Sequence, residues 1–165
     1  MIEVIKGLET ALADEIRLEA DLLAVGLRKR EALVRLDVPA VEQANSREQA
    51  LLGAIGHAAE RRLRRTAETA RLLGVPEAEA SVTRVAERAG EPWQAALTAQ
   101  ALELRKTLGE VARVNRANRT LTEQSLEYVK RFFRILGGVK DDMVYSRRDI
   151  ENRSDAPKLM IDETV

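Results

Sequence analysis

A seven-residue rhythm runs from Leu104 to Leu136 and constrains the fold of this chain more than any other feature. Side chains recur along it at alternating intervals of four and three residues: Leu104, Leu108, Val111, Asn115, Asn118, Thr122, Ser125, Val129, Phe132 and Leu136. This spacing places all of them on one face of a helix, the face that packs on other helices in a coiled coil. The residues are 45% hydrophobic but only 3% aromatic, which is typical of long helices. The sequence therefore predicts an all-α fold.

Proline and glycine divide the chain into its predicted elements. Long helices are expected from Ile2 to about Leu36, from Asp37 to Gly74 and from Pro92 to Gly137, with a short helical piece from Pro76 to Gly90. Short joins make neighbouring helices antiparallel. We predict an elongated antiparallel helical bundle, or coiled coil, of three long helices plus one short helix over residues 1–137. No helical period extends through residues 138–165, which are predicted to form a mobile C-terminal tail.

Composition argues against several function classes. Lysine and arginine equal aspartate and glutamate at 27 each, so no overall field attracts nucleic acid. The N-terminus lacks a signal peptide and no apolar run approaches a membrane span, so a cytoplasmic protein without membrane insertion is expected. There is no cysteine, and His57 is the only histidine, so no metal site or cofactor is predicted. No phosphate loop or catalytic carboxylate pair is visible, and we expect no enzyme.

Four arginines, Arg61, Arg62, Arg64 and Arg65, form a basic cluster. Two interpretations are open for them, a phosphate-binding patch or a solvated helix face with ion pairs to nearby glutamates. The second is favoured, because over two helical turns these side chains point in several directions.

The middle of the heptad face is polar, since Asn115, Asn118, Thr122 and Ser125 stand where a coiled coil prefers leucine or isoleucine. A buried asparagine fixes helix register at a cost in stability, and an unpaired buried amide costs about 1–3 kcal/mol. If these amides are buried they need polar partners, and the candidates on other helices are Glu15, Glu19 and Glu48. The alternative is a polar seam open to solvent or to a partner.

The segment after this polar seam holds four of the five aromatic side chains. They could close the end of the bundle core. However, the third long helix is about ten residues longer than the others, so its end is expected to extend past them and to expose apolar surface, which usually binds something. We therefore predict a partner-binding surface made of Tyr128, Val129, Phe132, Phe133 and Leu136. Two side chains of the tail, Met143 and Tyr145, are predicted to close over the bound partner.

Residues 1–150 resemble the flagellar export chaperone family FlgN. The most specific match is Asn115-Arg116-Ala117-Asn118-Arg119-Thr120-Leu121, which is similar to the family's Asn-x-x-Asn-x-x-Leu, followed by Leu126-Glu127-Tyr128 and by Tyr145-Ser146. Arg147-Arg148-Asp149 departs from the family pattern, in which a glycine follows the tyrosine soon afterwards.

The resemblance implies a cytoplasmic type III secretion chaperone for bacterial flagellum biogenesis, with no ATPase activity of its own. Its partners would be the hook-associated proteins of the hook–filament junction and the flagellar export apparatus. An amphipathic segment of the secreted protein would pack on the apolar end of the third long helix. The alternative is a non-catalytic structural helical adaptor that dimerises through its C-terminal apolar surface, and a homo-oligomer remains open on the sequence.

Overall fold

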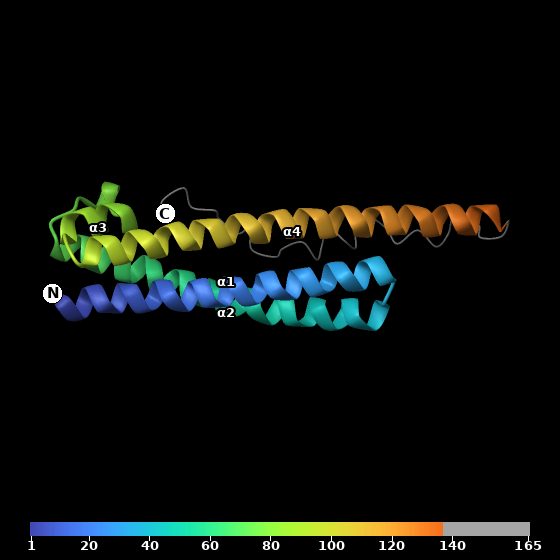
Figure 1. Cartoon of the computed structure of the whole chain (residues 1–165), viewed down its shortest axis with the longest axis horizontal. Helices are drawn as coiled ribbons and strands as arrows, with labels where there is room; N and C mark the ends of the chain where they lie inside the picture. The colour runs from blue at the N-terminus through green and yellow to red at the C-terminus, as the bar shows by residue number, and fades with distance from the viewer. Residues whose placement is uncertain (137–165) are drawn as a thin grey trace. The chain divides into compact units, whose positions relative to one another are not determined.

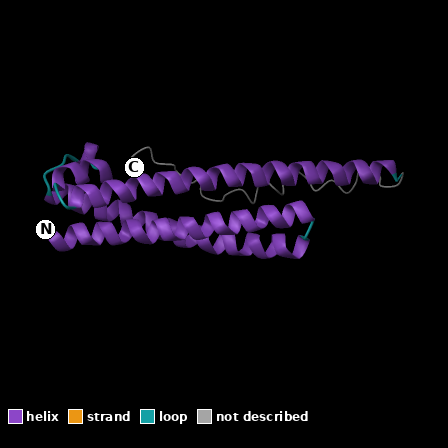
Figure 2. Cartoon of the chain, in the orientation of Figure 1, coloured by secondary structure: helices purple, strands orange, loops and turns teal. Residues whose placement is uncertain are grey.

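A computed structural model describes residues 1–136, and these residues form helices joined by short turns (Figure 1). The elements are α1 (Ile2–Arg35), α2 (Val38–Leu72), the 3-10 turn η1 (Glu77–Glu79), α3 (Val82–Ala89) and α4 (Trp93–Ile135). No strand occurs between residues 1 and 136 (Figure 2). The prediction of an all-α bundle with three long helices and one short helix is confirmed. The predicted tail, residues 138–165, lies outside the described residues.

The turn between α1 and α2 follows from its local sequence. Leu36 ends α1 in the left-handed region at φ 56°. The Asp37 side chain then caps α2 by accepting the Ala40 backbone N–H at 3.1 Å, and Pro39 occupies the first turn, where no N–H is needed. Only two residues separate the helices, so α1 and α2 form a tight hairpin.

The connection from α2 to α4 is more irregular than the sequence predicts. Gly74 adopts a positive φ of 70° just after α2, as expected for a glycine at a helix end. The prediction that Pro76 opens the short helix is wrong, because Pro76 precedes η1 instead. Helix α3 begins at Val82, directly after Ser81, whose hydroxyl accepts the Arg84 backbone N–H at 3.2 Å. Ser81 is thus the N-cap that sets the start of this helix.

The described chain divides into two units, of which one contains Met1–Leu121 and the other begins at Thr122. Within the first unit, α1 and α2 run antiparallel, since Glu15 meets Arg62 and Lys29 meets Glu48. Helix α4 runs parallel to α1 over this unit. Two side chains of α4 show this, because Gln100 and Asn118 donate to the carbonyl oxygens of Glu9 and Gly26.

The core of the first unit consists of two apolar clusters. One joins α1, the end of α2, α3 and the start of α4, and it contains Ile5, Leu8, Leu12, Ala70, Val82, Val85, Ala86, Leu97, Ala101 and Leu104. The other joins the second half of α1 to α2 and α4, and it contains Leu22, Val25, Ala44, Leu51, Ile55 and Val111. Between them along α1 lie two buried carboxylates, Glu15 and Glu19.

Candidate functional site

The last eleven described residues, 126–136, expose a set of large apolar side chains. No described residue after Asn118 is buried. The exposed fractions run from 46% to 82% for Leu126, Tyr128, Val129, Phe132, Phe133, Ile135 and Leu136. By contrast, Trp93 at the start of α4 packs against the first apolar cluster. We call the seven exposed side chains from Leu126 to Leu136 the apolar surface. An apolar surface of this kind on a helix marks a binding site more often than chance.

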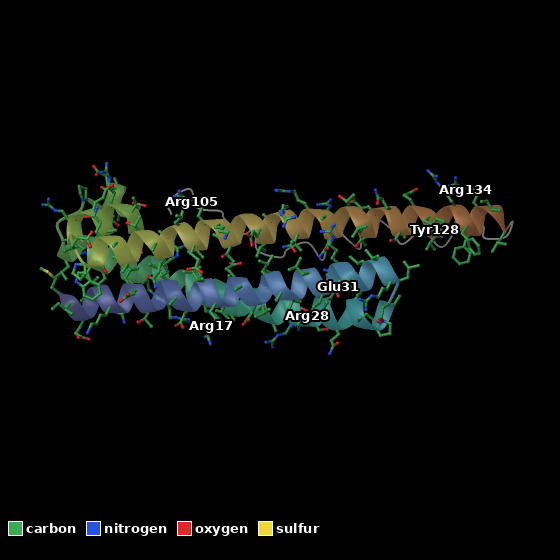
Figure 3. The ribbon with its side chains drawn as sticks, in the orientation of Figure 1. Arg17, Arg28, Glu31, Arg105, Tyr128 and Arg134 are labelled. Atoms are coloured by element: carbon green, nitrogen blue, oxygen red, sulfur yellow. The ribbon has the colours of Figure 1, made fainter. Side chains whose placement is uncertain are left out.

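Helix geometry gathers the apolar surface on one half of α4. With about 100° between successive residues, its seven side chains fall within about 180° of arc, from Ile135 and Tyr128 at one border to Phe133 and Leu126 at the other. The charged side chains occupy the opposite half, and Tyr128 and Arg134 leave the helix on different sides (Figure 3). The apolar arc is wider than the stripe of about 100° that a surface helix usually buries. The helix can therefore accept a partner along a broad face.

The two phenylalanines of the apolar surface contact each other. The ring centroids of Phe132 and Phe133 are 6.1 Å apart and the ring planes meet at 74°, an edge-to-face arrangement. This is a favoured geometry for aromatic pairs. The pair offers a partner a preformed aromatic contact.

All the predicted binding residues that the structure describes are exposed, namely Tyr128, Val129, Phe132, Phe133 and Leu136. Met143 and Tyr145 lie outside the described residues. The predicted binding set lacks Leu126 and Ile135, which the structure exposes beside these residues. A signal for Leu126 was present, because Thr122, Leu126, Val129, Phe133 and Leu136 form a second row with intervals of four and three.

The two asparagines of the polar seam have different environments. Asn118 is buried, with 3% of its surface exposed, and its side-chain Nδ2 donates to the Gly26 carbonyl oxygen at 2.8 Å. Asn115 is exposed, which agrees with the alternative of a seam open to solvent at this position. Its side-chain Oδ1 still lies toward α1, 3.8 Å from where a Cβ on Gly26 would be. Further along, Thr122 is exposed and Ser125 is half-buried.

The carboxylates proposed as asparagine partners have other roles. Glu15 Oε2 accepts the Arg62 Nε–H at 2.8 Å, and both side chains are buried. Glu48 Oε2 accepts from Lys29 Nζ at 2.6 Å. The expectation that Arg62 lies on a solvated face is therefore wrong, and both of these predicted asparagine partners pair with cations. The buried Asn118 meets a backbone carbonyl, which no sequence pattern reveals.

The family described as FlgN protein matches residues 1–150. This match covers most of the chain. The chain belongs to the FlgN family. No curated protein and no solved structure matches. Membership in FlgN implies the role of a flagellar export chaperone, and it confirms the resemblance found in the sequence.

Two features of this FlgN chain bear on other kinds of site. None of the described helices is both long enough and apolar enough to span a membrane. Within residues 1–136, no group of three or more histidine, aspartate and glutamate side chains is arranged to hold a metal ion. His57 is exposed, with its Nδ1 3.9 Å from Glu60 Oε2.

The basic cluster of this FlgN chain lines an open groove between α1 and α2 of about 560 Å³. Arg61, Arg64 and Arg65 contribute to it, but so do the carboxylates of Asp14 and Glu68. Arg65 is already paired with Glu68 at 2.9 Å. With its charges nearly balanced, the groove is a poorer candidate for binding than the apolar surface of α4.

Proposed function

We propose that this chain holds hook-associated proteins of the hook–filament junction in the cytoplasm before export, through the apolar surface of residues 126–136. The observation that carries the proposal is the exposure of seven large apolar side chains on one half of α4, in a family of flagellar export chaperones. Exposing them in an unbound protein is unfavourable, and a partner that covers them gains the corresponding burial.

The proposed binding mode is helix against helix. An unfolded secreted protein has amphipathic segments, whose apolar side chains are shielded from water only when they pack against another apolar surface. Such a segment would lie along α4, with the Phe132–Phe133 pair as its main anchor. The binding needs no ATP, because burial of apolar surface drives it. Met143 and Tyr145 would close over the bound segment, and the flagellar export apparatus would receive it.

The test measures both the binding affinity and the melting temperature of two variants. Truncating a central anchor of an interface costs roughly 2–4 kcal/mol, so Phe132→Ala and Phe133→Ala should each weaken binding of a hook-associated protein by about 30-fold or more. Isothermal titration calorimetry measures the affinity. Melting temperatures should stay close to that of the unchanged protein, because both side chains are exposed.

Leu102→Ala is the matched control, since Leu102 is a large side chain exposed on the same helix, at 66%, far from the apolar surface along the chain. It should leave the affinity unchanged. A lowered melting temperature with unchanged affinity in the phenylalanine variants would refute the proposal. Light scattering tests separately whether the chain forms a dimer. If Phe132→Ala abolishes such a dimer and the unchanged protein binds no hook-associated protein, the structural adaptor is favoured instead.

A further inference from the structure

Cations stand at both borders of the apolar surface. With about 100° per residue, Lys130 lies about 40° from Leu126 at one border, and Arg131 lies about 40° from Ile135 at the other. Arg134 lies instead in the middle of the polar half, beside Glu127. Border positions of this kind are where paired helices place the charges that select a partner. Lys130 and Arg131 are therefore placed to contact a bound segment, and Arg134 is not.

The ion pairs within this stretch leave Arg131 available. Lys130 Nζ is 3.3 Å from Glu127 Oε1. Neither Arg131 nor Arg134 forms an ion pair with another residue among 1–136. Arg134 is in the last turn of α4, where a cation is favoured by the helix dipole without any partner. Arg131 has the same charge at a border, where a partner's carboxylate could reach it.

Residues 126–136 carry three cations, Lys130, Arg131 and Arg134, against the single carboxylate of Glu127. This local excess stands out because the chain as a whole has a formal net charge of zero. A second copy of the same surface would bring the same excess and be repelled. A partner with acidic side chains next to its apolar stripe would be attracted.

We propose that the apolar surface selects an amphipathic helical segment with aspartate or glutamate at the border of its own apolar stripe, where a carboxylate pairs with Arg131. This inference rests on the proposed function, because it describes which segment of a secreted protein the same surface takes. Apolar contacts provide most of the affinity. The border charges discriminate among segments that are equally apolar.

Three synthetic helical peptides test the inference on the full chain. They share one leucine stripe and differ only at the border positions, which carry glutamate, glutamine or lysine. Fluorescence anisotropy should rank their affinities glutamate, glutamine, lysine, with about two- to fivefold between neighbours at low salt. The differences should shrink at high salt, because exposed charges are screened. Equal affinities, a preference for lysine, or no binding of the glutamate peptide would overturn the inference.

Two charge reversals on α4 locate the effect. Arg131→Glu should abolish or invert the ranking, whereas the matched Arg134→Glu should preserve it, because Arg134 faces away from the apolar surface. Equal effects of the two reversals would refute a specific role for Arg131. Phe132→Ala should weaken all three peptides. If it does so while border charge has no effect, the proposed function stands and only this inference fails. If it changes none of the affinities, the proposed function fails at this surface.

Discussion

Gly26 sets how closely α1 and α4 approach. A Cβ at this position would lie 3.1 Å from the Val114 Cγ1 atom, closer than such atoms ordinarily come. Its carbonyl oxygen also accepts the Asn118 side-chain amide at 2.8 Å. A single glycine thus allows both an apolar and a polar contact from α4. Neither contact could be predicted, because a glycine within a helical pattern looks only like a weak helix former.

Replacing Gly26 by alanine separates close packing from helix propensity. In Gly56→Ala, the matched control on α2, the new Cβ meets nothing within 4 Å, so the gain in helix propensity should stabilise the fold by about 0.5–1 kcal/mol. In Gly26→Ala the same gain is offset by displacement of Val114. We expect it to be about 1 kcal/mol less stable than Gly56→Ala in urea unfolding. Equal stabilisation by both changes would show that Gly26 does not limit the approach.

Arg62 shows a signal that sequence reasoning overlooked. Its place in the sequence groups it with Arg61, Arg64 and Arg65, but of these four only Arg62 is buried. Counted along α2 it continues the core row of Leu51, Ile55 and Ala58 at intervals of four and three. A row position was therefore a better guide to burial than the clustering of charges. Its partner Glu15 likewise lies at a core position in the helical row of α1.

At the scale of elements, α1 carries a polar layer between its two apolar clusters. Leu12 belongs to one cluster and Leu22 to the other, with the buried Glu15 and Glu19 between them. Arg62 compensates Glu15. Burial, together with the nearby Glu15 carboxylate, raises the pKa of Glu19 to about 7. Such a layer is suited to fixing the register of α1 against α2, as buried polar groups do in coiled coils.

The raised pKa of Glu19 predicts a stability that depends on pH. The folded state binds this proton more tightly than the unfolded chain, whose pKa is near 4.5, so the stabilisation is fully present below pH 4.5 and is lost as pH rises through about 7. The shift corresponds to at most about 3 kcal/mol, less where solvent screens the charge. Urea unfolding between pH 5 and pH 8 should show this loss.

Glu19→Gln is the control for this prediction, since a neutral amide of the same shape cannot titrate. The difference in unfolding free energy between Glu19→Gln and the unchanged protein should grow as pH rises from 5 to 8. Comparing the two proteins at each pH removes the titration of all other carboxylates. A constant difference across this range would show that Glu19 is ionised throughout.

The helices themselves could be predicted well, and their environments less well. The Asp37 cap, Pro39 and Gly90 mark helix ends as expected. The start of α3 was misplaced because Pro76 is the stronger local signal, whereas Ser81 makes the capping hydrogen bond. Along α4 one heptad row was recognised from the sequence, but the second row through Leu126 and Phe133 was not. The second row matters because it widens the apolar face.

For the molecule as a whole, composition indicated the fold class but could not assign residues to core or surface. The formal neutrality of the chain concealed the basic excess at residues 126–136. Whether Phe132 and Phe133 close a core or remain exposed depends on what packs against them, and periodicity alone does not specify that. Their exposure in the structure supports a binding surface. For the same reason the heptad spacing alone could not tell that Asn118 is buried while Asn115 is exposed.

On the proposed function, a secreted hook-associated protein covers the apolar surface of α4. Backbone hydrogen exchange, measured by mass spectrometry on the full chain with and without a saturating hook-associated protein, tests it most directly. We expect added protection to concentrate in peptides covering residues 126–136, while peptides from the second apolar cluster, such as residues 44–55, exchange as before. Added protection in peptides of α1 and α2, with no change over residues 126–136, would contradict it.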